Sequence, residues 1–358
     1  MKRILVFGLS GHLGGTEVVF NTFYNYFDKN KYKFDFVARD GEIAFQDDYK
    51  KHGSKIYQTP NFVKRPIKYY ITVKGIMSRY DVVYINMLSA ANILPVLAAK
   101  NSNMRKIILH SHNGNTIGAE RKILHFFGKI FLKKDVYVKI ACSDAAGKFL
   151  FGNSEYKVIK NPFDAEKFKY NLKFRREIRR KFDISDDCVV LGAVGRLSPE
   201  KNPLFLVNIV DALSVKYDNI RLMFVGSGKL KKQIIERAKK YNILDKVILV
   251  DSTGEVYKYY SALDLFLMPS VYEGLGMSGL EAQAAGLKCI FSDSVPNEID
   301  LGNNLHIKLD LDLWARKISE NLDSGRRDRS VDVRKFKRDF GSEINGEKLL
   351  RVLDGGVK

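Results

Sequence analysis

The chain has 358 residues, enough for two domains of ordinary size, and 45% of them are hydrophobic and 28% charged. This composition is that of a folded globular protein and excludes wholesale disorder, a collagen-like repeat and a long coiled coil. Lys and Arg outnumber Asp and Glu by 60 to 41, which gives a net charge of +19. Residues 1–165 carry +13 of that charge, with 26 basic against 13 acidic side chains, so an anionic partner is expected there.

Cysteine usage and hydropathy indicate the compartment. The three cysteines, Cys142, Cys188 and Cys289, are scattered and odd in number, which favours a reducing environment such as the cytosol. The most apolar stretch, residues 87–99, is interrupted by polar residues and Pro95 and falls short of the ~18 residues that a membrane span needs. Any membrane contact is therefore expected to be peripheral.

Short β-branched runs alternate with longer helical patterns along the whole chain, which predicts parallel sheets with crossover helices. The strands expected in the first half are 3–7, 33–37, 81–85, 106–109, 136–141 and 157–159. Those expected in the second half are 189–194, 221–225, 247–250, 265–268 and 288–291. We therefore predict an α/β protein with two doubly wound domains, 1–165 and 166–330, and a helical tail, 331–358, that can pack back on the first domain.

A glycine-rich loop, Gly11-His12-Leu13-Gly14-Gly15-Thr16-Glu17, follows the first expected strand and precedes a helix. Glycines in this position let backbone N–H groups approach an anion at the helix N-terminus. The alternative is a simple tight turn. The loop does not have the G-x-G-x-x-G pattern, and the second expected strand does not end in an acidic residue, so a nicotinamide cofactor is not expected.

Two further loops, in the second half, carry paired charges. Arg196 and Lys201 lie on one loop after a strand, where they can converge on a diphosphate; a solvated charged loop is the alternative. Glu273 lies in the Gly-rich sequence 270–279, and Glu281 falls in the first turns of the next helix. The two carboxylates can accept hydrogen bonds from sugar or ribose hydroxyls.

His110 and His112 end the strand at 106–109, so both rings are expected on one face. No cysteine or carboxylate stands nearby at ligand spacing, which argues against zinc. Each ring could instead be a buried structural histidine, or could bind a substrate hydroxyl or relay a proton.

Residues 121–134 interleave basic and bulky apolar side chains in the manner of an interfacial helix, and residues 62–79 show a similar mixture. These two stretches could touch anionic lipid headgroups. A core helix with basic edges is the equal alternative.

Jointly these motifs resemble the retaining nucleotide-sugar glycosyltransferases of glycosyltransferase family 4, especially bacterial enzymes of capsule and exopolysaccharide assembly. The resemblance covers nearly the whole chain. It is carried by the loops named above and by Ser143, Asn161, Val225-Gly226-Ser227-Gly228 and Glu281-Ala282-Gln283-Ala284-Ala285-Gly286.

The resemblance implies a GT-B fold, in which two Rossmann-like domains face a cleft, with the acceptor on the first domain and the nucleotide-sugar on the second. It implies a catalytic role for His110 and Glu273, with His112 as a substitute for His110 and with Asn161 as a further site residue. The implied donor-binding residues are Gly15, Arg196, Lys201, Gly274, Leu275, Gly276 and Glu281, where Gly15, Arg196 and Lys201 hold the diphosphate and Glu281 the ribose.

The implied activity is metal-independent, retaining transfer of a hexose, with a UDP-sugar as the commonest donor and with neither cofactor nor metal. The implied acceptor is a polyprenyl-diphosphate-linked saccharide, which places the protein in the cytoplasm on the inner face of the membrane. A nucleic-acid partner is not expected, because no helix-turn-helix, zinc-finger or RNP pattern is present. The alternatives are a UDP-sugar epimerase of the same architecture and a non-catalytic basic protein that binds polysaccharide or membrane.

Overall fold

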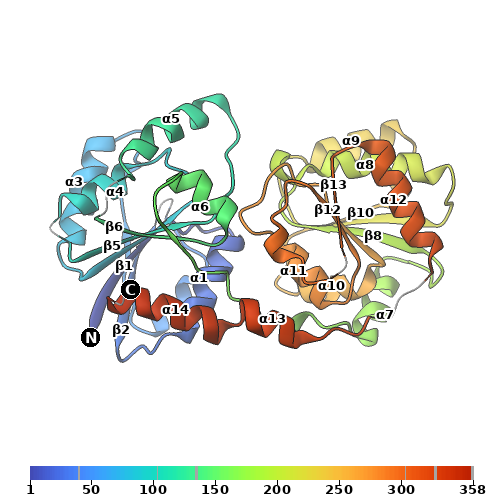
Figure 1. Cartoon of the computed structure of the whole chain (residues 1–358). Coiled ribbons are helices and arrows are strands. Elements are labelled where there is room, and N and C mark those ends of the chain that lie inside the picture. The colour runs from blue at the N-terminus through green and yellow to red at the C-terminus, as the bar shows by residue number, and fades with distance from the viewer. Residues whose placement is uncertain (39–40, 103, 134–135, 303, 326–328, 356–358) are drawn as a thin grey trace. The chain divides into compact units, whose positions relative to one another are not determined.

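The computed structural model describes residues 1–38, 41–102, 104–133, 136–302, 304–325 and 329–355. The chain forms two compact units (Figure 1). Unit 1 comprises Met1–Phe163 together with Arg338–Lys358, and unit 2 comprises Asp164–Lys337. The sequence-based borders were 165/166 and 330/331.

Unit 1 is a parallel sheet with helices on both faces (Figure 1). Its strands are β1 (Lys2–Phe7), β2 (Tyr32–Ala38), β3 (Ile56–Gln58), β4 (Val82–Met87), β5 (Lys106–Ser111), β6 (Tyr137–Ala141) and β7 (Lys157–Val158). Its helices are α1 (Gly15–Tyr26), α2 (Gln46–Lys51), α3 (Pro66–Met77), α4 (Leu94–Lys100), α5 (Ala119–Ile130), α6 (Asp144–Phe151) and α14 (Ser342–Asp354).

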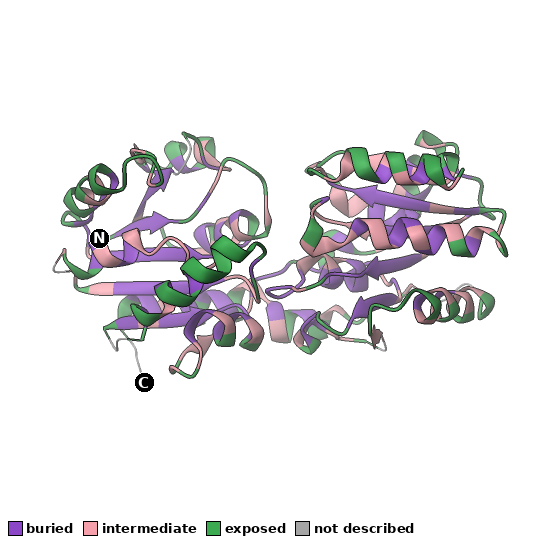
Figure 2. Ribbon diagram, turned by 90° about the horizontal axis from the view of Figure 1, so that it is seen from above, coloured by how far each residue is buried: buried purple, intermediate pink, exposed green. Residues whose placement is uncertain are grey.

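The strand order in unit 1 is β3-β2-β1-β4-β5-β6-β7, and every pair is parallel. Side chains alternate between the two faces: Ile4 and Val6 of β1 join a core under α1 and α14, whereas Leu5 and Phe7 join a core under α3, α4 and α6. Such two-sided burial explains why these strands read as nearly continuous apolar runs. Figure 2 shows the strands mostly in the colour of buried residues.

Unit 2 repeats the architecture with a second parallel sheet. Its strands are β8 (Val189–Val194), β9 (Ile220–Val225), β10 (Val247–Val250), β11 (Leu265–Met268), β12 (Cys289–Ser292) and β13 (Leu305–Ile307). Its α-helices are α7 (Leu172–Lys181), α8 (Pro203–Ser214), α9 (Lys231–Lys240), α10 (Val256–Ala262), α11 (Met277–Ala284) and α12 (Leu311–Asp323), followed by α13 (Val333–Phe340), within which unit 2 ends. Short 3₁₀ helices are η1 (Glu166–Phe168), η2 (Pro199–Lys201), η3 (Leu244–Lys246) and η4 (Asn297–Ile299).

The strand order in unit 2 is β10-β9-β8-β11-β12-β13. The core on one face of the sheet is formed with α8, α9 and α12, whose Trp314 is fully buried. Trp314 also donates a 2.9 Å hydrogen bond from its indole N–H to the carbonyl of Lys308, so the buried ring leaves no polar atom unpaired.

The expected α/β class with two doubly wound sheets is confirmed. All eleven expected strands are present within a residue or two of their bounds, while β3 and β13 are additional edge strands. Residues 326–328, near the end of the expected second domain, lie outside the described residues. Among the described residues, no helix combines the length and the hydropathy that crossing a bilayer would need.

Candidate functional site

A candidate site lies in unit 2, where the order of the strands reverses. Strand β8 is flanked by β9 on one side and by β11 on the other, so the crossovers that leave β8 and enter β11 diverge to opposite faces. In open α/β sheets, ligands bind at the carboxyl ends of the strands at this point. The loops after β8 and β11 carry Lys201 and Glu273.

Lys201 and Glu273 form an ion pair across the two loops, with Nζ 2.5 Å from Oε1. The hydroxyl of Ser270 donates to the same carboxylate oxygen at 2.6 Å, and Glu273 is buried. A backbone hydrogen bond of 2.8 Å from Val271 N–H to the carbonyl of Glu200 ties the loops together. The carboxylate is therefore fixed by two donors, which holds both charged groups in one geometry.

Close backbone contact between neighbouring loops supports this arrangement. Gly226, which follows β9, has φ +146°, and a Cβ placed on it would lie 2.0 Å from the carbonyl oxygen of Gly195. The N–H of Leu197 donates to the carbonyl of Ser227 at 3.0 Å. The loop that bears Arg196 and Lys201 is thus clamped against the loop after β9.

Arg196 lies at the solvent edge of this loop. Its side chain is 69% exposed, and its guanidinium is 3.3 Å from Glu200 Oε1. An exposed pair of this kind contributes little to stability, so the guanidinium can turn toward a ligand at low cost. Gly274, Leu275 and Gly276 follow Glu273, and Gly276 is the N-cap of α11, with φ +99°.

Glu281 projects from α11. Its Oε2 accepts a 2.6 Å hydrogen bond from the hydroxyl of Tyr260, which comes from α10. Burial raises the pKa of the Glu281 carboxyl, and the Tyr260 hydrogen bond, Lys167 and Lys201 partly offset that effect. The field of Lys201 therefore reaches Glu281 as well as Glu273, and unit 2 gathers these three predicted residues into one region.

The corresponding point in unit 1 lies between β1 and β4. The predicted glycine loop follows β1 and leads into α1, whose N-cap is Gly14. Glu17 closes the loop, because its Oε1 accepts from both the backbone N–H and the hydroxyl of Ser10, at 3.0 and 2.9 Å. No described atom lies within 4 Å of a Cβ placed on Gly15, so the helix N-terminus is open there.

His110 and His112 lie on one face at the end of β5, with ring centroids 3.9 Å apart. His110 has no exposed surface, and its Nδ1 lies 2.5 Å from the hydroxyl of Tyr84. His112 is only half-buried, and its Nε2 is 2.8 Å from Oδ1 of Asn86. Of the two rings, His112 is therefore the one within reach of a ligand.

The partners of His112 define its tautomer. Asn86 donates from Nδ2 to the carbonyl of Phe7 at 2.9 Å, so its Oδ1 must accept from Nε2–H of His112. Nδ1 of His112 is then an acceptor. Burial lowers the pKa of His112 to about 3, and burial together with His112 lowers the pKa of His110, so both rings are neutral near pH 7.

Asn161 is buried in unit 1 after β7, and its Oδ1 lacks a hydrogen-bond partner among the described residues. Ser143 caps α6 through a 3.1 Å hydrogen bond from the N–H of Ala146. Within the described ranges, no group of three or more His, Cys, Asp or Glu side chains is arranged to hold a metal ion.

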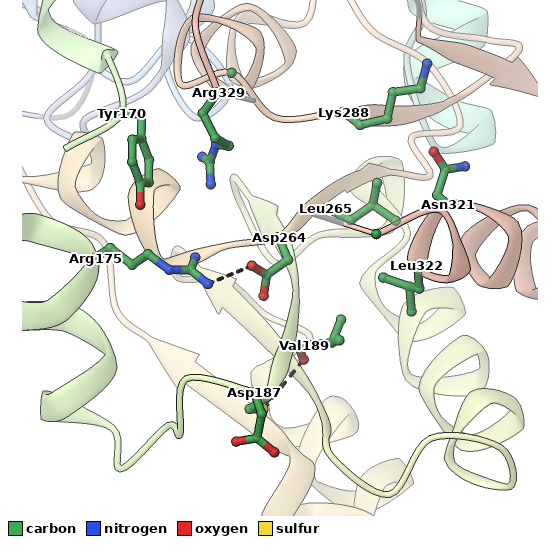
Figure 3. Close-up of a pocket in the computed structure, with 13 residues that line it drawn as sticks. Tyr170, Arg175, Asp187, Val189, Asp264, Leu265, Lys288, Asn321, Leu322 and Arg329 are labelled. Atoms are coloured by element: carbon green, nitrogen blue, oxygen red, sulfur yellow. Dashed lines mark hydrogen bonds and ion pairs between the residues drawn. The ribbon is translucent and has the colours of Figure 1, made fainter. Parts of the chain in front are cut away.

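A separate cavity of about 220 Å³ lies at the opposite, amino-terminal edge of the unit 2 sheet (Figure 3). Arg175 and Arg179 bind Asp264 there at 2.8 and 2.6 Å. Arg329 donates to the carbonyls of Ala285, Leu263 and Tyr260. The three guanidinium groups are therefore already bound to the carbonyls and the carboxylate at the end of α10 and at the end of α11. The cavity contains none of the predicted site residues.

Sequence reasoning missed four residues that support the site: Ser270 beside Glu273, Tyr260 beside Glu281, and Tyr84 and Asn86 beside the histidines. Tyr84 and Asn86 are two apart on β4, and Asn86 pairs with His110 in register. Two polar residues on one face of an otherwise apolar strand were the available signal.

The sequence is similar to those of known proteins. Residues 174–306 match the family described as glycosyl transferases group 1. The chain is 28% identical over 343 residues to the putative glycosyltransferase EpsF of Bacillus subtilis, covering 91% of this chain and 89% of EpsF. It is 25% identical over 257 residues to an Escherichia coli UDP-Gal:alpha-D-GlcNAc-diphosphoundecaprenol alpha-1,3-galactosyltransferase, covering 68% and 64% of the two chains. The expected glycosyltransferase is confirmed at this level.

Solved structures share the fold. HepE of Anabaena in complex with UDP-glucose superimposes with a TM-score of 0.81 at 16% identity, covering 99% of this chain and 100% of HepE. Sucrose-phosphate synthase from Thermosynechococcus elongatus gives 0.81 at 15% identity, covering 99% of each chain. These likenesses concern the fold and confirm two Rossmann-like domains of the GT-B class.

Proposed function

We propose that this chain, a glycosyltransferase of the group 1 type, moves a hexose from a UDP-sugar to a polyprenyl-diphosphate-linked saccharide. The reaction retains the anomeric configuration and needs no metal ion, as in family 4. The product belongs to a bacterial surface polysaccharide, and the protein works in the cytoplasm at the inner face of the membrane. The observation that carries the donor assignment is the Lys201–Glu273 pair at the switch point of unit 2.

The chemistry required of unit 2 is stabilisation of a departing nucleoside diphosphate. Lys201 is a cation already fixed in place, and Arg196 is an exposed cation five residues earlier that can close on the same phosphates. Preorganised charges of this kind stabilise the negative charge that develops on the leaving oxygen. Glu273 holds Lys201 and accepts donor-sugar hydroxyls, while Glu281, oriented by Tyr260, accepts the ribose hydroxyls.

In unit 1, Gly15 offers the open N-terminus of α1 to the diphosphate. His112, through its Nδ1, accepts a hydrogen bond from a sugar hydroxyl. His110 has no exposed surface and packs against the ring of His112, so it positions His112 and does not itself contact the substrate. Asn161, with its unpartnered Oδ1, is a second acceptor for substrate hydroxyls. The acceptor's proton passes to the departing phosphate during attack on the same face of the sugar.

The choice of substrates rests on relatives. HepE has been crystallised with UDP, with UDP and glucose, and with UDP-glucose, and the E. coli relative is named for UDP-Gal and a diphosphoundecaprenol acceptor. EpsF, the relative with the longest aligned segment of those given above, is named a putative glycosyltransferase. These names support UDP as the nucleotide and a lipid diphosphate as the acceptor's carrier.

The test is thermal unfolding of the full chain with UDP, GDP or ADP, each with EDTA. A nucleotide present at a hundred times its dissociation constant adds about 2.7 kcal/mol to the unfolding free energy. We expect UDP to raise the melting temperature and Lys201→Ala to abolish the shift, with the exposed Lys239→Ala as the matched control. A UDP-sugar supplied with lipid-linked saccharide should then release UDP.

Three outcomes contradict the proposal. A shift with none of the nucleotides, or one that persists unchanged in Lys201→Ala, would remove the donor site from this position. Conversion of the UDP-sugar to its epimer without release of UDP would instead identify an epimerase.

A further inference from the structure

The cavity at the amino-terminal edge of the unit 2 sheet has no role in the proposed transfer (Figure 3). Its volume is about 220 Å³, and all of its lining residues belong to unit 2. Pockets for drug-sized ligands begin at about 300 Å³, whereas an apolar cavity of about 150 Å³ holds benzene. The space therefore suits a small metabolite of roughly ten non-hydrogen atoms and is too small for a nucleotide-sugar.

The lining of this cavity carries more positive than negative charge. Its cations are Arg175, Lys288 and Arg329, and its acids are Asp187 and Asp264. Asp264 is shared between two guanidinium groups, because Oδ1 is 2.8 Å from Arg175 and Oδ2 is 2.6 Å from Arg179, which is not itself a lining residue. Two acids therefore face four cations, and the excess is two positive charges.

Neither lining acid neutralises Arg329. Asp264 is bound to Arg175 and Arg179, and Asp187 lies at the opposite end of the cavity from Arg329 (Figure 3). Hydrogen bonds from Ser185, from its own backbone N–H and from Asn219 lower the pKa of the Asp187 carboxyl. The described part of the chain thus gives Arg329 no ion-pair partner.

Arg329 is held by neutral groups instead. It donates from Nε, Nη1 and Nη2 to the carbonyls of Ala285, Leu263 and Tyr260, at 2.9, 2.9 and 3.1 Å. Its guanidinium carbon lies 4.5 Å from the centroid of the Tyr170 ring. A guanidinium has five N–H groups, so one N–H on each terminal nitrogen is left over.

The surroundings disfavour the charge on Arg329. Burial and, after it, the charge of Arg175 lower the pKa of Arg329 to about 10, and Asp264 offsets only part of this effect. In Figure 3, Arg175 and Arg329 point toward the same space from two sides. An anion in that space would accept the remaining N–H groups and offset the excess positive charge.

A phosphate monoester matches both the charge and the donors. It carries about −1.5 to −2 at pH 7, close to the excess of two, whereas a carboxylate supplies a single negative charge. Its oxygens can accept two parallel N–H groups from one guanidinium. Leu265 and Leu322 provide an apolar wall for a short carbon chain, and Asp187 can accept hydroxyl groups at the far end.

We propose that the cavity binds a small hydroxylated phosphate monoester, with its phosphate at Arg329 and its hydroxyl groups toward Asp187. The site is separate from the donor site, because its lining includes neither Lys201 nor Glu273. Its occupant neutralises the cation that joins the last turn of α10 to the end of α11, so binding stabilises unit 2. The inference goes beyond the proposed function and does not depend on it.

The experiment is thermal unfolding of the full chain over a range of glycerol 3-phosphate concentrations, with glycerol and inorganic phosphate measured in parallel. We expect glycerol 3-phosphate to raise the melting temperature and glycerol to have no effect at the same concentrations. Inorganic phosphate should bind about tenfold more weakly, because it lacks the contacts with Asp187 and with the apolar wall. Lys201→Ala removes a cation of the donor site and should show the same shift with glycerol 3-phosphate.

Variants of the lining test the site directly. Lys288→Gln removes one lining cation without changing the hydrogen bonds of Arg329, and it should weaken glycerol 3-phosphate binding about tenfold, whereas Lys288→Arg should retain binding. Lys239→Gln removes an exposed charge elsewhere in unit 2, so this matched control should bind as the unaltered chain does. Arg329→Gln should abolish binding, and circular dichroism checks that this variant folds without the three carbonyl contacts.

The inference is overturned if glycerol 3-phosphate does not stabilise the unaltered chain, or if Lys288→Gln and Lys239→Gln bind it equally well. It is also overturned if the shift disappears in Lys201→Ala, which would place the phosphate in the donor site. Equally tight binding of inorganic phosphate would make the cavity a site for the free ion and would overturn the assignment of a monoester. The shift with UDP is a separate measurement, so failure of this inference and failure of the proposed function are distinguishable.

Discussion

The switch points of the two sheets share a backbone arrangement but differ in their chemistry. In unit 2 the loops after β8 and β11 bring together Lys201 and Glu273, two opposite charges, and the Glu273 carboxylate also accepts a hydrogen bond from Ser270. In unit 1 the end of β5, which lies beside β4, carries two histidines that burial keeps neutral and that neutral partners on β4, Tyr84 and Asn86, orient.

This difference shows how one architecture supports two tasks. A fixed cation beside a carboxylate suits a ligand that bears both phosphates and hydroxyls. A neutral imidazole with a defined acceptor nitrogen suits a hydroxyl whose proton is shared or moved, and it does so without adding charge to the site. The fold alone would not distinguish the two tasks, because both sheets are parallel and doubly wound.

The largest effect should come from the charge in unit 2. Lys201→Ala should lower kcat by about 10²- to 10³-fold, since a fixed group that stabilises the leaving charge is lost. Glu273→Gln should also be damaging, and the double variant should lose less than the product of the two single losses, because each residue acts through the other. Initial rates of UDP release measure this, with Lys239→Ala as the control. If the loss of kcat in the double variant equals the product of the two single losses, the two residues act independently and the prediction is wrong.

In unit 1, His112→Ala should lower kcat by about 10²-fold, the usual contribution of a positioned histidine. Tyr84→Phe removes only the hydroxyl beside His110 and should have a smaller effect. Turnover and circular dichroism of both variants distinguish loss of function from loss of fold. A larger loss in Tyr84→Phe than in His112→Ala would mean that His110, rather than His112, contacts the substrate.

The third prediction concerns stability and pH. The pKa of His112 is about 3 in the folded chain and near 6.5 when unfolded, so the unfolded chain binds an extra proton between these values. The unfolding free energy should therefore fall by up to about 1.4 kcal/mol for each unit that pH decreases below 6.5, and His110 should add to this fall. The raised pKa of Glu281 acts in the opposite direction, because its protonated form is favoured in the folded chain.

Urea unfolding at pH 7, 6 and 5 measures this slope. His112→Gln, which retains a donor for Asn86, should reduce the slope, and Glu281→Gln should increase the loss of stability toward low pH. Equal slopes in all three proteins would mean that neither group changes its pKa on folding.

Much of the fold was predictable because buried parallel strands are apolar on both faces and therefore stand out in sequence. The two strands that were not predicted, Ile56–Gln58 and Leu305–Ile307, have three residues each and lie at sheet edges. A run of three residues cannot display a period of two clearly enough to be distinguished from a loop.

The site was predictable where charge or glycine follows a strand, as at Lys201 and Glu273. Its supporting contacts were not, because Tyr260 is 21 residues from Glu281 and no local pattern joins them. The histidines show the remaining limit: alternation places both rings on one face, but only packing against Tyr84 shows that His110 is the covered one. The spacing of residues predicts the face of the sheet on which a side chain lies, whereas its accessibility depends on neighbours from other strands.

The return of the chain to unit 1 has a consequence for synthesis. Helix α14 packs against α1, and Asp354 binds both Lys2, at 2.8 Å, and Tyr32, at 2.7 Å. Unit 2 is continuous in sequence, whereas the core of unit 1 includes Leu349, Val352 and Leu353. During translation the ribosome therefore completes unit 2 before it releases the last helix that unit 1 needs. Unit 1 is begun first, but its core is completed last.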